Sequence, residues 1–283
     1  MTITSIELLA RNPGDPTSLI SIPMRDDFET PVFVVGVSGL SIDKLGSAAK
    51  QWSMGYRQTP EPREITLLLG LRPNYEQYQT MQSLRDHIYR SIAQTPYGII
   101  IFRMNMEDGS ARETEALVTK VDTNPATATP QLQLTLKALS PVFTGLTTNQ
   151  SASMSGGSKL TVLDEVSTAP HGMTFEFELG SGVSPTQPIV FTRTSSSDTF
   201  TLNIVTGVVS AWAAGQKITV DSRSGSRSVY MSAGGLMFYI NACVGARSVW
   251  PEVRPGVPEE FTSSAPGTFI DGQMSYRHTF WGV

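Results

Sequence analysis

The sequence has little of the material from which catalytic and metal sites are built. It contains one cysteine, Cys243, and three histidines among 283 residues. A single cysteine excludes an internal disulfide and any zinc site that needs several thiolates. Cys243 lies in an apolar segment, so we expect a packed small hydrophobic residue rather than a reactive thiol. His87, His171 and His278 show no metal-ligand spacing, and we expect His87 on the polar side of a helix, the other two on strand faces or in loops, and no bound metal.

Charge and long apolar runs are also scarce. Charged residues make up 16% of the chain, against about 25% in an average globular domain. The net charge of −4 is spread over both halves, and no basic cluster is present that would hold nucleic acid electrostatically. The apolar runs, such as residues 32–37 and 65–71, fall far short of the roughly 18–20 residues that span a bilayer. We therefore expect neither sequence-specific nucleic-acid binding nor membrane insertion, and residues 1–20 show no secretory signal.

The motifs of common enzyme sites are absent as well. The sequence has no Gly-x-Ser-x-Gly nucleophile elbow and neither of the glycine-rich loops that hold phosphates or dinucleotides. Acidic pairs occur at Asp26-Asp27, Asp164-Glu165 and Glu259-Glu260. All three flank turn-like sequence, so we expect solvated turns rather than a general-acid pair. The sequence thus predicts a protein that is not an enzyme and has no cofactor.

Turn formers and alternating apolar residues are abundant, which favours β structure. Glycine and proline together number 42, too many for a helical bundle. In the first half, short alternating or β-branched runs predict strands at residues 3–10, 18–22, 32–37, 65–71, 98–104, 111–121 and 131–139. Between them, an apolar stripe from Tyr78 to Ile92 predicts one helix, with Asn74 as N-cap and Pro96 beyond its end. Residues 39–62 read as a long hairpin or loop.

No helical period appears after a Ser/Thr/Asn/Gly-rich stretch near residues 145–155, where we place the domain boundary. Residues 173–179 alternate between apolar and polar side chains, and further short strands recur between turn signals. This spacing is typical of a β-sandwich. We therefore predict a mainly β protein with one α-helix, made of a helix-bearing β domain (1–147) and a β-sandwich (148–283).

Several stretches in this order resemble the distal tail proteins of siphophages. Residues 63–75 lead into the expected helix, and residues 131–143 form an alternating strand that ends in Ser-Pro-Val-Phe. Residues 250–256 read Trp-Pro-Glu-Val-Arg-Pro-Gly, and residues 275–281 read Ser-Tyr-Arg-His-Thr-Phe-Trp near the end of the chain. The residues that carry the last two likenesses are Trp250, Pro251, Arg254, Pro255, Gly256, Tyr276 and Trp281. The likeness departs from the family at residues 39–62, which lack the Asp-Gly turn expected before the strand at Ile65.

The resemblance implies a structural role in a virion. Residues 1–147 would form a belt domain related to tail-tube subunits that closes into a hexameric ring, and residues 148–283 a galectin-like sandwich. The ring would lie at the distal end of the tail, between the major tail tube protein and a tail hub protein of the tail-associated lysin type. Receptor-binding or other baseplate proteins would attach to it, the tape measure protein would lie nearby, and the lumen would let DNA pass.

A second hypothesis stays open from the residues alone. Sandwich folds can stack sugars on exposed aromatic side chains, and Trp212 and Trp250 are the candidates here. The alternative is therefore a host-glycan-binding module, either a receptor-binding or a carbohydrate-binding protein.

Overall fold

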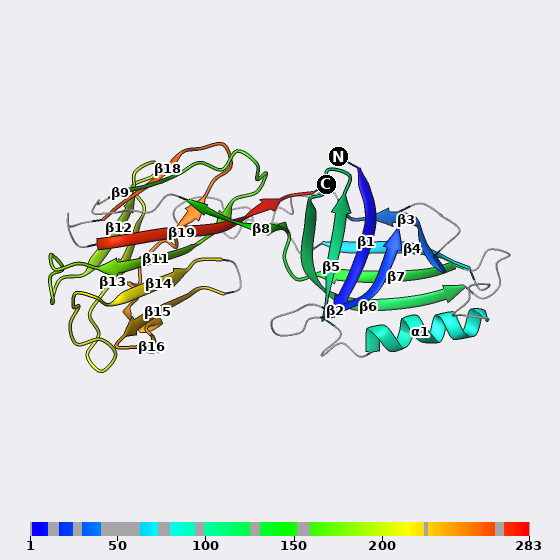
Figure 1. Ribbon diagram of the computed structural model, residues 1–283, viewed down its shortest axis with the longest axis horizontal. Coiled ribbons are helices and arrows are strands. Elements are labelled where there is room, and N and C mark those ends of the chain that lie inside the picture. Colours follow the sequence, from blue (N-terminus) through cyan, green and yellow to red (C-terminus); the bar gives the residue numbers. More distant parts are fainter. Residues whose placement is uncertain are drawn as a thin grey trace. The chain divides into compact units, whose positions relative to one another are not determined.

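The computed structural model describes residues 2–10, 17–24, 30–40, 63–72, 80–93, 99–124, 131–151, 159–223, 226–263 and 269–282. Over these residues the chain is mainly antiparallel β structure with one α-helix (Figure 1). It forms two compact units, which we call unit 1 (Met1–Leu146 with Phe280–Val283) and unit 2 (Thr147–Thr279). The predicted fold class is confirmed. The units divide between Leu146 and Thr147, and the last four residues return to unit 1.

Unit 1 contains two layers of antiparallel strands. One layer has the order β8-β6-β5-β1-β2, and β6 continues into a second layer with the order β6-β7-β4-β3. The strands are β1 (Ile3–Ala10), β2 (Thr17–Pro23), β3 (Val32–Ser38), β4 (Glu64–Leu71), β5 (Ile99–Met106), β6 (Ala111–Asn124), β7 (Gln131–Ala138) and β8 (Phe143–Ser151). Strand β6 serves both layers because it pairs first with β5 and then with β7, with a register shift between Val118 and Lys120. A bulge at such a point bends a strand and increases its twist.

The core of unit 1 lies between these layers and the helix. Alternation along β7 buries Leu132, Leu134 and Leu136, as a half-buried strand requires. Helix α1 (Met81–Ala93) contributes Leu84 and Ile88 to the same core. Apolar residues from the strands and the helix therefore cover one another.

Helix α1 begins later than the sequence pattern predicts. Thr80 and Ser83 form reciprocal caps, because the Ser83 amide donates to Thr80 Oγ1 at 3.1 Å and the Thr80 amide to Ser83 Oγ at 3.3 Å. This exchange satisfies backbone donors that the first helical turn leaves free. The predicted cap Asn74, the predicted stop Pro96 and residues 41–62 of the predicted loop lie outside the described residues.

Unit 2 is a β-sandwich. One sheet has the order β16-β15-β14-β11-β19, the other β13-β12-β18-β9, and β10 pairs with β17. The strands are β9 (Lys159–Val162), β10 (His171–Gly172), β11 (Thr174–Leu179), β12 (Ile189–Arg193), β13 (Thr199–Leu202), β14 (Lys217–Asp221), β15 (Ser228–Ala233), β16 (Leu236–Tyr239), β17 (Glu252–Val253), β18 (Glu259–Ser263) and β19 (Phe269–Phe280), with a 3-10 turn η2 (Asn241–Cys243). Both sheets contribute to one core, in which the rings of Phe175 and Phe177 each meet Phe191 edge-on at 5.0 Å.

Cys243 is buried in this core, in agreement with the sequence-based expectation. Burial raises the pKa of its thiol above the ordinary value. A neutral buried thiol is a poor nucleophile, and it packs here as a small hydrophobic side chain.

Candidate functional site

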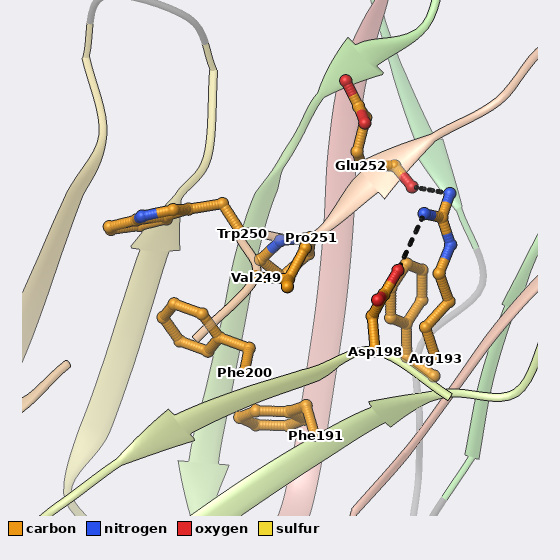
Figure 2. Close-up of a pocket in the computed structure, with 9 residues that line it drawn as sticks. Phe191, Arg193, Asp198, Phe200, Val249, Trp250, Pro251 and Glu252 are labelled. Carbon is orange, nitrogen blue, oxygen red and sulfur yellow. Dashed lines mark hydrogen bonds and ion pairs between the residues drawn. The ribbon is translucent and has the colours of Figure 1, made fainter. Parts of the chain in front are cut away.

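Trp250 stands at one end of a depression in unit 2 (Figure 2). Its apolar lining includes Phe191, Phe200 and Pro251, while Arg193 and Glu252 lie at the opposite end from the indole. The depression has about 240 Å³ of empty space when open solvent is counted. The space that it encloses is much smaller, and therefore far below the roughly 300–1,000 Å³ of pockets that hold small organic ligands.

The indole of Trp250 is half-buried and has two neighbours. The ring of Phe200 lies 5.1 Å away, centroid to centroid, and the guanidinium carbon of Arg227 lies 6.0 Å from the indole. Trp212, the other tryptophan predicted to contact a glycan, is only 1% exposed and belongs to the core. Its ring is therefore not available to a saccharide, and that part of the prediction is wrong.

A buried carboxylate, Glu259, organises one side of the depression. It accepts hydrogen bonds from Arg193 Nε at 2.7 Å, Arg193 Nη2 at 2.6 Å, Arg254 Nε at 2.5 Å and Ser195 Oγ at 2.7 Å. Burial alone would raise the pKa of Glu259, but these donors hold it below the ordinary value. Glu259 is thus a structural anion, and not the solvated turn residue that the sequence pattern predicts.

The polar groups of the depression are largely satisfied by one another. Arg193 also donates from Nη2 to the carbonyl of Glu252 at 2.6 Å and approaches Asp198 Oδ2 at 4.0 Å. The Asp198 carboxylate in turn accepts from Ser196 Oγ at 2.6 Å. A ligand would have to displace these contacts, and burial of displaced charges is costly.

A second buried carboxylate, that of Asp164, contacts two of the three histidines. His171 Nε2 lies 2.7 Å from Asp164 Oδ2, and His278 Nδ1 lies 3.0 Å from Oδ1. Ser167 Oγ donates to Oδ2 at 2.5 Å, and the amides of Val166 and Ser167 donate to Oδ1 at 3.0 Å. Burial alone would raise the pKa of Asp164, but these hydrogen bonds hold it far below its usual range. The expectation of a solvated turn at Asp164 is wrong, and His171 and His278 share one carboxylate.

The geometry around Asp164 is not that of a nucleophile held by a base. Ser167 Oγ donates to the carboxylate and accepts the Thr279 amide at 2.9 Å, so the hydroxyl is occupied in the interior. His171 Nδ1 lies 3.1 Å from the Gly172 carbonyl, so both ring nitrogens face acceptor oxygens. These contacts tie the turn at Asp164 to β10 through His171 and to β19 through His278.

The segment at residues 250–256, which carries part of the family likeness, runs between the two carboxylate networks. Arg254 contacts Glu259, while the Gly256 amide donates to the Asp164 carbonyl at 2.7 Å with Gly256 at φ +67°. Pro251 is buried, and Pro255 lies half-buried between Arg254 and Gly256.

The two remaining residues of the likeness belong to different units. Tyr276 stacks on His171 at 5.0 Å, next to the Asp164 network. Trp281 belongs to unit 1, where its carbonyl accepts Arg63 Nη2 at 2.6 Å. Tyr276 therefore contacts a residue of the Asp164 network, and the described contacts of Trp281 are made in unit 1.

Neither a metal centre nor a membrane span emerges from the residues that the structure describes. Among them, no group of three or more histidine, cysteine or acidic side chains is arranged to hold a metal ion. No helix in the described ranges is long and apolar enough to cross a bilayer.

Comparison with solved structures shows that this fold, a helix-bearing β unit with a β-sandwich, is that of a phage adsorption-apparatus protein. That protein is SPP1 Dit (gp 19.1), described as a paradigm of the hub adsorption apparatus in phages that infect Gram-positive bacteria. The TM-score is 0.63 at 12% sequence identity, over 97% of this chain and 99% of that one. The resemblance to distal tail proteins is thus confirmed at the level of fold.

Other similarities are weaker. The phage P2 baseplate in its activated conformation, solved with Ca and with Sr, gives TM-scores of 0.48 and 0.45 at 10% identity, over 99–100% of each chain. Scores below 0.5 do not establish a shared fold. No protein-family model matches the sequence, and no curated protein matches it.

Proposed function

We propose that this chain is a structural, non-enzymatic protein of a long non-contractile phage tail. It forms a hexameric ring at the distal end of the tail tube, in the virion. The observation that supports this is the fold shared with SPP1 Dit over nearly the whole length of both chains. Independent support comes from the residues themselves, because the stretches at 63–75, 131–143, 250–256 and 275–281 resemble the same family in sequence.

In this proposal, unit 1 forms the ring and unit 2 binds other proteins. Unit 1 closes the ring by a head-to-tail contact repeated around a six-fold axis. It joins the major tail tube protein to the tail hub, while unit 2 anchors receptor-binding or other peripheral baseplate proteins. The lumen lets DNA pass, so its wall is acidic or neutral, because a basic lining would hold phosphates.

The test is the mass and shape of the purified full-length protein. Six copies of the 30.7 kDa chain give about 184 kDa, and negative-stain images are expected to show six-fold rings. A strictly monomeric protein that also fails to form rings when mixed with its tail tube protein would overturn the proposal. A ring structure with a channel lined by lysine and arginine would contradict the lumen assignment.

The saccharide hypothesis now depends on Trp250, whose half-buried indole borders the depression. If unit 2 binds host glycan there, Trp250→Ala abolishes binding on a glycan array while leaving the mass of the assembly unchanged. Trp212→Phe, a change in the core, serves as the control that retains binding.

A further inference from the structure

Strand β16 (Leu236–Tyr239) is an exposed apolar edge of unit 2. It is the last strand of its sheet, and within the described part of the chain β15 is the only strand that pairs with it. Its four consecutive side chains are all large and apolar, and they are 64%, 71%, 44% and 58% exposed for Leu236, Met237, Phe238 and Tyr239. Because side chains alternate along a strand, apolar groups face solvent on both sides of this one.

The strand is held firmly in this exposed position. Gly234 and Gly235, at φ +58° and +80°, form the two-residue turn between β15 and β16. Positive φ at both residues is typical of a type I′ turn, whose twist suits a hairpin. At the other end, Tyr239 meets Tyr230 edge-on at 5.2 Å, and its hydroxyl accepts Asn241 Nδ2 at 2.6 Å.

Among the described residues, β16 carries none of the usual protections of an edge strand. Natural edges carry charged side chains, prolines or bulges that prevent pairing with another strand. Residues 236–239 include no charge and no proline, and their register with β15 is regular. An edge of this kind pairs readily with a further strand.

The hairpin register identifies which backbone groups are free to pair. Ala233 and Leu236 flank the two-residue turn, so they form a hydrogen-bonded pair whose N–H and C=O groups face each other. Hydrogen-bonded and non-hydrogen-bonded pairs alternate along an antiparallel ladder. Met237 and Tyr239 therefore direct their N–H and C=O groups outward, away from β15.

We propose that β16 pairs, antiparallel, with β16 of a second copy of this chain around a two-fold axis at Phe238. In this register each Met237 lies opposite Tyr239 of the second copy, and each such pair exchanges both of its N–H···O bonds. Phe238 then faces Phe238 of the second copy as a non-hydrogen-bonded pair, where side chains approach most closely.

The absence of charge on β16 and the exposed area of its side chains both favour a second copy of this chain as the partner that pairs with it. A two-fold pair sets like side chains near one another, so a charge near the axis would repel its copy, and β16 has none. A fully covered aromatic side chain buries roughly 150–250 Å². Scaled by their exposed fractions, the four side chains of two copies offer on the order of 1,000 Å², the lower limit for a specific interface.

This contact goes beyond the proposed ring and does not depend on it. A ring closes by a heterologous contact, whereas the β16 pair is isologous and joins two copies only. The two contacts therefore give different masses: six copies if only the ring forms, two if only β16 pairs, and twelve or more if both form.

The first experiment compares the mass of the wild type with that of Phe238→Lys by light scattering. The substitution places two like charges at the axis, so the mass is expected to fall to half or less. Val166→Lys, which places the same charge on another exposed apolar position of unit 2 (57% exposed), is the control and leaves the mass unchanged. Equal masses for the wild type and both variants, whether six copies or one, overturn the β16 pairing.

Cross-linking tests the register itself. Across a non-hydrogen-bonded pair the Cα atoms lie about 4.5 Å apart, within the span of a disulfide. Phe238→Cys is therefore expected to form a covalent dimer under mild oxidation with copper phenanthroline, because Cys243, the only native cysteine, is buried.

Met237→Cys is the matched control for the cross-link, because its own copy lies diagonally across the axis in this register. We expect little covalent dimer from this variant. Equal cross-linking of both variants, or pairing with an added baseplate protein in place of self-pairing, overturns the proposal.

Discussion

At the scale of single residues, the most unusual features are two buried carboxylates in unit 2. Glu259 is fully buried with two arginines, and Asp164 is buried with two histidines and Ser167. A buried charge that loses its partner is costly, whereas a fully paired one fixes a unique arrangement. Both networks border the segment at residues 250–256, so they explain why that segment keeps its place without forming long strands.

Glu259→Gln tests the first network. The change keeps the shape but removes the charge, and it leaves the guanidinium of Arg193, with a side chain only 8% exposed, without its carboxylate. We expect the free energy of unfolding of unit 2 to fall by about 3–5 kcal/mol, measured by urea denaturation followed by tryptophan fluorescence. The neighbouring Glu260→Gln is the control and stays within about 0.5 kcal/mol, since Glu260 is only half-buried. Equal stability of the two variants would contradict a structural role for Glu259.

The second network predicts a pH dependence. The pKa of Asp164 is lower in the folded chain than its unfolded value of about 3.9, so folding favours the ionised carboxylate. The stability that this group contributes is therefore full above the unfolded pKa and is lost as the pH falls below about 4 toward the folded pKa. The difference in melting temperature between wild type and Asp164→Asn is expected to be large at pH 6 and to shrink toward pH 3. A difference that stays constant over this range would show that the carboxylate charge is not what stabilises the fold.

At the scale of elements, the alternation and spacing of residues predict strands and the helix, because these depend on neighbouring residues in the chain. Alternation locates the predicted strands with small errors at their ends, because a strand with one buried face repeats every two residues. Strands β8, β9, β12 and β18 lie in stretches where the pattern predicts no strand, and β8 occupies part of the stretch predicted as the domain boundary. The helix is real, but its described start is Met81 with Thr80 as cap. The Thr80-x-x-Ser83 spacing that closes this cap is visible in the sequence.

The carboxylate networks could not be predicted in the same way. Asp164 does occupy a turn, with its own carboxylate bonded to the amides of Val166 and Ser167, so the local pattern is correct. One of its partners is His278, which lies more than a hundred residues away on β19, and Glu259 depends likewise on Arg193 of β12. A single sequence does not reveal pairs that only the sheet order brings together, and the exposure of β16 is hidden for the same reason.

At the scale of the whole molecule, the chain passes between its units twice. Strand β8 starts in unit 1 and continues into unit 2, and β19 brings the chain back, so that Phe280 belongs to unit 1. The Phe280 ring packs in the core of unit 1 beneath the Arg112 guanidinium, whose carbon lies 3.8 Å from the ring centre. Arg112 Nη1 also donates to the Gly282 carbonyl at 2.7 Å.

This division of β19 gives a prediction with its own control on the same strand. Phe280→Ala removes a large core side chain and is expected to destabilise unit 1 by about 3–5 kcal/mol. Amide hydrogen exchange is then expected to speed up in unit 1 and to stay unchanged in unit 2. Met274→Ala, six residues earlier in the core of unit 2, is expected to do the reverse. Faster exchange in the same unit for both variants would contradict the boundary at Thr279.

The chain passes between the units at β8 and again at β19, and the position of these two strands affects which changes of sequence unit 1 can tolerate. Strands β8 and β19 are hydrogen-bonded neighbours, so the points where the chain enters and leaves unit 2 lie side by side. Unit 2 is thus an insertion whose two attachment points coincide, the arrangement in which inserted domains are best tolerated. An insertion attached at one place can be replaced or lengthened while the path of the chain through unit 1 stays the same.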